Sequence, residues 1–368
     1  MPLGPAIWRA RRDSPPMSDR RILILTEGRF GVFDAKTATC VIRYAADEVV
    51  GVLDSVTAGQ TTDQVLGFGP AIPIVATLEE GLALGPDTLL IGVAPRGGLL
   101  PDAWRSLIAA ALEAGLTVAS GLHTFLGDDP ELVTIATRSG GQIIDLRRVP
   151  DDLPVASRRA DQVDATVVLT VGTDCNVGKM TAAMELTLAA RRMGYRAVFV
   201  PTGQTGLFLD GRGLAIDRVI ADFIAGAAEV MVLDNAPGND FVFVEGQGSL
   251  LHPGYSGVTL GLLHGSMPDA QVLVHPPTRK VSVEDEIEIE PLPEWIELHE
   301  QIAGYLKPAP VAGVAINGWD LSESEARAWA ERIAAETGRP AIDPVKFGAE
   351  PLVEAIIAVR PTVNTESR

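Results

Sequence analysis

One glycine-rich segment constrains the fold of this chain most strongly. Residues 167–182, VVLTVGTDCNVGKMTA, join an apolar run to a turn holding Gly172 and Gly178, after which Lys179 begins an amphipathic helix. A strand, a glycine loop and a helix in this order form a phosphate-binding loop, in which backbone N–H groups and the helix N-terminus point at one anion. The lysine adds a mobile positive charge. The segment therefore predicts a parallel α/β domain with an anion site.

From Arg21 onward, apolar strand candidates alternate with helical segments, which is the pattern of parallel βαβ units. The expected strands are residues 22–25, 49–53, 88–93, 117–120 and 143–146 in a first domain, and 165–170, 197–200, 241–244, 271–275 and 311–316 in a second. The clearest expected helices are residues 101–114, 179–193, 215–233, 295–305 and 323–337, and a weaker helical pattern covers 77–84. We predict an α/β protein with an N-terminal Rossmann-like parallel sheet followed by a P-loop NTPase-like, doubly wound domain.

A polar stretch with two prolines separates the two patterns. We expect a disordered tail over residues 1–18, a Rossmann-like domain over 19–150, a linker over 151–163 and a P-loop domain over 164–368. The first residues lack the apolar region of a secretory signal, and no run approaches the roughly 20 apolar residues that span a bilayer.

Composition limits the partners. Lys and Arg number 30 against 48 Asp and Glu, a formal net charge of −18, which repels nucleic acid and anionic membranes. Cys40 and Cys175 are too few for a disulfide framework and lack zinc-site spacing, so we expect a reducing, cytoplasmic location. The acidic residues 284–286, 288 and 290 read as an exposed edge strand or loop, and no metal is expected.

The loop departs from the usual Walker pattern. Five residues separate its glycines instead of four, and Met180 stands where a nucleotide triphosphatase has the Ser or Thr whose hydroxyl binds Mg²⁺. A thioether is a poor Mg²⁺ ligand, and Thr181 lies about 100° further round the helix. We predict a loop that holds a phosphate or pyrophosphate, such as that of coenzyme A, without splitting it. Its binding residues are Gly172, Thr173, Asp174, Cys175, Asn176, Val177, Gly178, Lys179, Met180 and Thr181.

Other candidate residues follow expected strands. Glu245 ends the 241–244 strand, and the carboxyl ends of strands line the crevice of a doubly wound sheet. Gln247 follows it as a candidate substrate contact, and His252 can take a proton near neutral pH. Arg279 and Lys280 follow the 271–275 strand, where they bind a substrate carboxylate or pair with the nearby acidic run.

Part of the chain resembles the dethiobiotin synthetases. The loop spacing is similar to their GTDxxVGKT loop, and residues 244–248 are similar to their VEGxGG segment. By this resemblance, Asn317 occupies the place that contacts a nucleotide base. The implied activity is that of an ATP-dependent, carboxylate-activating ligase or kinase using Mg²⁺. This alternative leaves Met180 unexplained.

A second resemblance covers about residues 20–360. It rests on GRFGVFDAKTATCVIRY from Gly28, the VGTDCNVGKMT loop, PTGQTG at 201–206, AIDRVIADFIAGAAE at 215–229 and VEGQGSL at 244–250. These segments resemble a family of two-domain proteins, Rossmann-like then P-loop, that includes D-glutamate N-acetyltransferases. The resemblance implies transfer of the acetyl group of acetyl-CoA to the α-amine of a D-amino acid, chiefly D-glutamate, in its catabolism. Acetyl-CoA needs no phosphate hydrolysis, so a loop without the Mg²⁺ hydroxyl suits it.

Under this activity a base must deprotonate the substrate ammonium. We expect Glu245 or His252 in that role, Lys179 and the loop amides on the phosphates of CoA, and Arg279 or Lys280 on substrate carboxylates. A third interpretation is a non-catalytic nucleotide or CoA sensor. We also expect a homo-oligomer.

Overall fold

A computed structural model describes residues 20–32, 34–93, 98–282, 287–289 and 291–359. The chain divides into two compact units. The first holds residues 1–150 together with Gly203–Gly211, and the second holds Asp151–Thr202 and Arg212–Arg368. The sequence analysis placed residues 203–211 in the P-loop domain, and the structure differs at this point. The tail expected over residues 1–18 lies outside the described residues.

The first unit is built on a parallel sheet in the order β3-β2-β1-β4-β5-β6, which is the Rossmann order that we predicted. Its strands are β1 (Ile22–Leu25), β2 (Val49–Leu53), β3 (Ile74–Val75), β4 (Thr88–Ile91), β5 (Thr117–Ser120) and β6 (Gln142–Asp145). Its helices are α2 (Lys36–Tyr44), α3 (Thr62–Leu66), α4 (Leu78–Ala83), α5 (Asp102–Glu113) and α6 (Pro130–Ser139), with 3₁₀ turns η1 (Ala46–Glu48) and η3 (Leu126–Asp128). The central strands β1 and β4 are buried at every position and apolar at all but Thr88, as a sheet covered on both faces requires.

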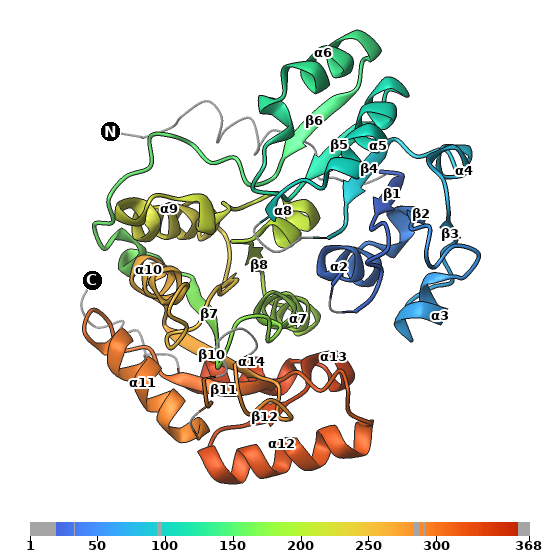
Figure 1. Ribbon diagram of the computed structural model, residues 1–368. Helices are drawn as coiled ribbons and strands as arrows, with labels where there is room; N and C mark the ends of the chain where they lie inside the picture. The colour runs from blue at the N-terminus through green and yellow to red at the C-terminus, as the bar shows by residue number, and fades with distance from the viewer. Residues whose placement is uncertain (1–19, 33, 94–97, 283–286, 290, 360–368) are drawn as a thin grey trace. The chain divides into compact units, whose positions relative to one another are not determined.

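Helix α8 (Gln204–Asp210) completes the first unit, although it follows strand β8 of the second in sequence. It packs beside α2 (Figure 1). The buried hydroxyls of Thr205 and Thr37 lie 2.8 Å apart, and Arg147 Nη2 donates to Gln204 Oε1 at 2.8 Å. These contacts between residues far apart in the sequence are the reason that α8 belongs to the Rossmann-like unit.

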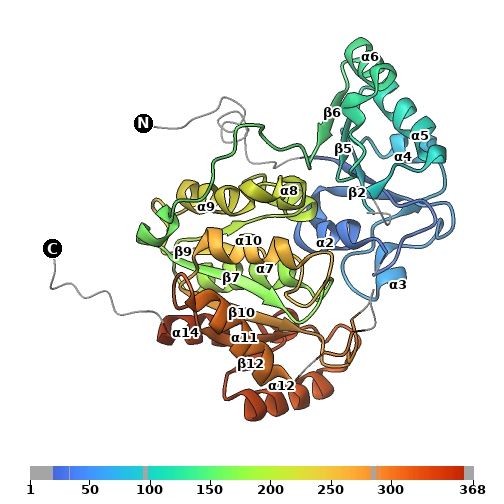
Figure 2. The same cartoon turned by 60° about the vertical axis from the view of Figure 1, so that its left-hand side comes forward.

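The second unit has a parallel sheet in the order β12-β11-β10-β7-β9-β8. Its strands are β7 (Thr166–Gly172), β8 (Ala197–Val200), β9 (Phe241–Val244), β10 (Ala270–His275), β11 (Val311–Ile316) and β12 (Ala341–Ile342). Its helices are α7 (Lys179–Arg192), α9 (Ile224–Asn235), α10 (Ser256–Ser266), α11 (Leu292–Gly304), α12 (Glu323–Thr337), α13 (Pro344–Phe347) and α14 (Glu350–Val359). Figures 1 and 2 show α9 and α10 side by side on one face of this sheet, with α7 and α14 on the other. The predicted doubly wound fold is confirmed.

Two element predictions in this unit were wrong. The helix expected over residues 215–233 begins only at Ile224, after 3₁₀ turns η5 (Ile216–Arg218) and η6 (Ala221–Phe223). The N–H of Ile216 donates to Thr202 O at 2.9 Å, which ties this segment to the end of β8. Conversely, the glycine-rich segment around His264, which is absent from the expected helices, forms helix α10.

Glu229 fastens the start of the second unit to α9. Its carboxylate is fully buried and accepts hydrogen bonds from the N–H groups of Ser157 (3.0 Å) and Arg159 (2.6 Å) and from the Arg159 guanidinium. Burial by itself raises the pKa of Glu229, but the donors outweigh it and hold that pKa below its ordinary value. The expected linker is thus anchored, and its last residues form the 3₁₀ turn η4 (Arg159–Gln162).

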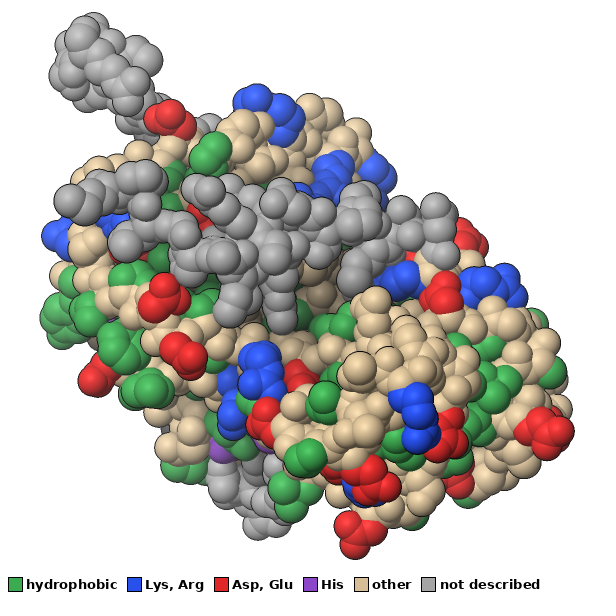
Figure 3. Space-filling model, turned by 90° about the horizontal axis from the view of Figure 1, so that it is seen from above, with side chains coloured by type: hydrophobic (Ala, Val, Ile, Leu, Met, Phe, Trp, Pro, Cys, Tyr) green, Lys and Arg blue, Asp and Glu red, His purple; other side chains and the backbone are tan. Residues whose placement is uncertain are grey.

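The surface mixes charges of both signs. On the face drawn in Figure 3, basic side chains lie in several separate groups among acidic ones. None of the helices in the described part of the chain is long and apolar enough to cross a membrane.

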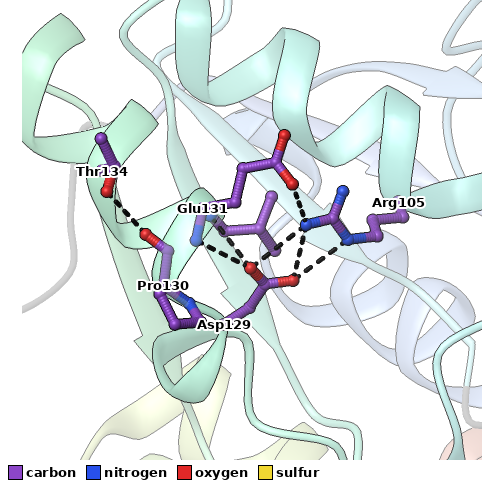
Figure 4. A network of polar contacts seen from close by, with 6 residues as sticks. Arg105, Asp129, Pro130, Glu131 and Thr134 are labelled. Carbon is purple, nitrogen blue, oxygen red and sulfur yellow. Dashed lines mark hydrogen bonds and ion pairs between the residues drawn. The ribbon is translucent and has the colours of Figure 1, made fainter.

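A single carboxylate starts helix α6 and ties it to α5 (Figure 4). Asp129 accepts from the N–H groups of Glu131 (2.9 Å) and Leu132 (3.3 Å) as the N-cap. It also accepts from Arg105 Nε at 3.0 Å and Arg105 Nη2 at 2.8 Å. Arg105 Nη2 bonds to the exposed Glu131 carboxylate as well, at 2.7 Å.

We expect Asp129→Ala to destabilise the protein by about 1 kcal/mol for the lost cap alone. The matched control is Glu131→Ala, which removes only an exposed ion pair and has a smaller effect. Thermal and urea unfolding of the two variants measure the difference. Equal effects would show that the cap contributes nothing beyond the ion pair.

Candidate active site

The loop between β7 and α7 is shaped by its two glycines. A Cβ atom on Gly172 would lie 2.7 Å from Val177 Cγ2 and 3.1 Å from Lys179 Nζ. Gly178 has φ +101°, a left-handed conformation that favours glycine, and a Cβ there would lie 3.3 Å from Asn317 Nδ2. The loop therefore makes a tight turn between β7 and α7 that a side chain at either glycine would disturb.

Lys179 folds back over this loop. Its side chain is buried, and Nζ donates to Asp174 O at 2.9 Å. The next residue, Met180, is only 2 % exposed, and Thr181 is half-buried. The ammonium group of Lys179 thus lies at the loop. Met180, a buried thioether, occupies the position that supplies the Mg²⁺-binding hydroxyl in nucleotide triphosphatases.

Asp174 and Arg279 brace the middle of the loop. The Asp174 carboxylate accepts from Cys175 N at 2.6 Å and from Arg279 Nη1 at 3.0 Å. Arg279 Nη1 also donates to Cys175 O at 2.9 Å. Asp174 is thus an ion-pair partner of Arg279. The neighbouring Lys280 side chain is exposed. Cys175 is half-buried, Asn176 is exposed and Val177 is buried.

Two buried histidines stand near these cations. His275, at the end of β10, has Nδ1 3.0 Å from Thr173 Oγ1, and burial together with the charge of Arg279 lowers its pKa to about 4. Burial also lowers the pKa of His299 on α11 to about 4, with a bond to Trp295 O opposing the shift and the charge of Lys179 adding to it. Both rings are therefore neutral at neutral pH.

Asn317 and Ser249 hold the loop from two other segments. Asn317 follows β11 and donates from Nδ2 to Val177 O at 2.9 Å, while its N–H donates to His275 O at 3.0 Å. Ser249 Oγ donates to Thr173 O at 3.4 Å. The structure thus brings Asn317 to the loop, where its amide contacts a loop carbonyl.

Glu245 lies at the carboxyl end of β9 and is 6 % exposed. Its Oε2 accepts from Thr202 N at 2.9 Å, and Thr202 Oγ1 donates to Glu245 O at 2.9 Å. Gln247 donates from Nε2 to Thr202 O as well. A Cβ on Gly246 would collide with Thr170 O at 1.7 Å and lie 3.2 Å from Lys179 Cδ, so this strand end presses against the phosphate loop.

His252 is buried and has a defined ring orientation. Its Nδ1 accepts from Gly254 N at 3.1 Å, and its ring stacks on Tyr255 with centroids 4.4 Å apart. A nitrogen that accepts a hydrogen bond carries no proton, so this bond assigns the neutral ring its proton on Nε2. In this tautomer His252 is a hydrogen-bond donor at Nε2.

A small cavity lies beside the start of the phosphate loop. It is lined by Thr173, Asp174, Ser249, Leu251, His252, Ser282, Ile287, Glu288, Ile289 and Trp295. The sequence analysis identified Thr173, Asp174 and His252 but missed Trp295, which it used only as the start of a helix. Residues 284–286 and 290 of the acidic run lie outside the described residues. The flanking Val281 and Glu288 form an antiparallel bridge.

Within the described residues there is no group of three or more His, Cys, Asp or Glu side chains arranged to hold a metal ion. The side chains of Lys179, Arg279 and Asn317 instead donate to carbonyl groups of the loop.

Comparison with known proteins identifies the family. Residues 55–149 match the model of a Rossmann-like domain, DUF1611_N, and residues 154–353 match that of a P-loop domain, DUF1611_C, both described as domains of unknown function. The chain belongs to the DUF1611 family. A crystal structure of a DUF1611 protein from Anabaena variabilis is 40% identical, covers 92% of this chain and 100% of its own, and superimposes with a TM-score of 0.88.

Two curated relatives have a named activity. A D-glutamate N-acetyltransferase of Tritonibacter scottomollicae is 40% identical over 288 residues, which are 77% of this chain and 85% of that protein. A D-glutamate N-acetyltransferase of Pseudoalteromonas is 36% identical over 276 residues, 74% of this chain and 82% of that one. The DUF1611 chain thus spans most of the length of both.

We expect Lys179→Met to weaken the binding of coenzyme A by roughly 10- to 100-fold, because a charged hydrogen bond to phosphate contributes about 1.5–3 kcal/mol. Lys280→Met is the matched control, since Lys280 is exposed and lies one residue after Arg279, which bonds to the loop. Isothermal titration with coenzyme A measures both variants. Unchanged affinity in Lys179→Met would contradict the anion site.

Proposed function

We propose that this DUF1611 protein is an N-acetyltransferase that moves the acetyl group of acetyl-CoA to the α-amine of D-glutamate. The observation that carries the proposal is the identity of 40% and 36%, over about three quarters of the chain, to two proteins named D-glutamate N-acetyltransferase. The phosphate loop with a buried methionine after its lysine supports it, because acetyl transfer needs an anion site but no phosphate cleavage.

The donor proposed for the loop is acetyl-CoA. Its pyrophosphate suits a glycine loop that leads into the N-terminus of a helix and whose buried lysine lies at hydrogen-bond distance from a loop carbonyl. On binding, Lys179 exchanges Asp174 O for a phosphate oxygen, which is a stronger acceptor because it is charged. Met180 contributes packing rather than a metal ligand.

Glu245 is the proposed general base. His252 is the proposed hydrogen-bond donor, through its Nε2–H group. A carboxylate accepts a proton directly, whereas the Nε2 of His252 already carries one in the tautomer assigned by Gly254 N. Glu245 takes a proton from the substrate ammonium, and the free amine forms a bond to the thioester carbonyl carbon. The tetrahedral intermediate then collapses with cleavage of the C–S bond, and the leaving thiolate takes up the second proton of the nitrogen.

The remaining site assignments stay predictions. Arg279 and Lys280 are candidates for the substrate carboxylates, although Arg279 Nη1 already bonds to the phosphate loop. Gln247 is a candidate substrate contact that braces Thr202, and Asn317 a candidate contact to the nucleotide part of CoA. We also propose a cytoplasmic location, where acetyl-CoA is available, and a homo-oligomer, to be checked by light scattering.

The proposal is tested by following free CoA with a thiol reagent while purified protein, acetyl-CoA and a panel of D- and L-amino acids are mixed. We expect release that depends on D-glutamate, without ATP and in the presence of a chelator, and N-acetyl-D-glutamate by mass spectrometry. Silence across the panel, with Mg²⁺-dependent ATP hydrolysis in parallel, would favour the ligase alternative instead.

We expect Glu245→Gln to lower kcat roughly 10²- to 10⁴-fold, the usual effect of removing a general base. Glutamine keeps an amide oxygen for the N–H of Thr202, so the strand end should fold normally. Titration with coenzyme A is the control, because this variant should bind it as the wild type does. Turnover that stays at the wild-type level would remove Glu245 from the mechanism.

A further inference from the structure

The peptide group between Glu245 and Gly246 lies just beyond the end of its strand. Strand β9 lies between β7 and β8 in the sheet and ends at Val244. The last register partners of Val244 are Leu169 on β7 and Val200 on β8. Beyond this point the regular pairing of β9 stops, so the C=O of Glu245 and the N–H of Gly246 need other hydrogen-bond partners.

Two threonine hydroxyls supply these partners. Gly246 N donates to Thr170 Oγ1 on β7 at 3.0 Å. Thr202, two residues after the end of β8, donates from Oγ1 to Glu245 O at 2.9 Å. Both threonines are buried and belong to the second unit. One peptide group is therefore held from both sides by side chains of the two neighbouring strand ends.

Thr170 also joins this peptide group to the phosphate loop. Its Oγ1 donates to Lys179 O, at the start of α7, at 3.1 Å, and lies 3.4 Å from Val244 O. A Cβ atom on Gly246 would lie 1.7 Å from Thr170 O, so glycine permits the close approach of the two strands here. A single hydroxyl thus accepts from the residue after Glu245 and donates to the residue proposed to bind the phosphates of CoA.

Thr202 holds the carboxylate of Glu245 as well as its backbone. Thr202 N donates to Glu245 Oε2 at 2.9 Å, which is the reverse of the bond from Thr202 Oγ1 to Glu245 O. Gln247 Nε2 donates to the same Thr202 Oγ1 at 3.2 Å, which leaves the single hydroxyl proton for Glu245 O. These reciprocal bonds restrict the main chain and the side chain of Glu245 together.

We infer that Thr170 and Thr202 are positioning residues, which hold Glu245 at a fixed place relative to Lys179 and keep its carboxylate aligned with the substrate ammonium. The inference rests on the proposed function, since it concerns the alignment of the same base. Both hydroxyls act through Glu245 and not on the substrate. A misplacement of about 1 Å can lower a rate roughly 100-fold, so turnover depends on these hydroxyls more than binding of CoA does.

The test replaces Thr170 by Val, which keeps the branched shape and removes the hydroxyl, and by Ser, which keeps the hydroxyl. Thr166→Val is the matched control, because Thr166 is buried on the same face of β7 and its hydroxyl has no hydrogen-bond partner within the described residues. We expect Thr170→Val to lower kcat roughly 10- to 100-fold, with the Kd of coenzyme A changed less than about threefold. Thr170→Ser and Thr166→Val should keep the turnover of the wild type.

Thr202→Val removes the second hydroxyl and decides the question if Thr170→Val does not fold. We expect the same result, a lower kcat with a nearly unchanged Kd of coenzyme A by calorimetry. An unchanged kcat in the folded valine variants would overturn the inference. Equal losses of kcat and of coenzyme A affinity would overturn it too, because the hydroxyls would then support the anion site and not the alignment of Glu245.

Hydrogen exchange of the Gly246 amide tests the same bond without turnover. In the ligand-free wild type and in Thr170→Ser this amide should exchange slowly, whereas in Thr170→Val it should exchange faster while the amides of β9 stay protected. Slow exchange of Gly246 in Thr170→Val would overturn the inference. Faster exchange, with no acetyl transfer to D-glutamate by the wild type, would keep the positioning of Glu245 and reject the proposed function.

Discussion

The tight turn from Gly172 to Lys179 is the constraint on which the candidate site depends. Its carbonyl groups and side chains are the hydrogen-bond partners of residues from the ends of other strands: His275 bonds to Thr173, Arg279 to Asp174 and Cys175, and Asn317 to Val177. Because each of these side chains contacts the loop directly, the loop helps to hold all of them in position. A change in loop shape would therefore rearrange the whole site at once.

The same loop also controls the local charge. Lys179 and Arg279 are buried or half-buried cations, and each lowers the pKa of a neighbouring histidine further than burial alone does. The two histidines stay neutral, and the charge of Arg279 is paired with the Asp174 carboxylate, so Lys179 supplies a positive charge at the loop. In a protein with a net charge of −18, this charge matters, because long-range repulsion has to be overcome locally for an anion to bind.

The sequence predicted the strands and the phosphate loop well, because apolar runs and the glycine spacing are local signals. Helix α10 is absent from the expected helices because glycine has a low helix propensity. A Cβ on Gly261 or Gly265 would collide with α9 at 2.1 Å, so these glycines permit close packing of two helices. Trp295 was missed for a related reason, since an aromatic residue near a helix start reads as core. Its unpartnered nitrogen is visible only once the surrounding structure is known.

Helix α8 has a consequence for the biosynthesis of this chain. The first unit includes residues up to 150 and again Gly203–Gly211, so its last element leaves the ribosome after β7, α7 and β8 of the second unit. The Rossmann-like unit is therefore incomplete when residue 150 emerges, with α2 lacking its neighbour. Folding of one unit after the other during synthesis therefore cannot be completed at residue 150. A fragment that ends at residue 150 would expose an apolar face of helix α2.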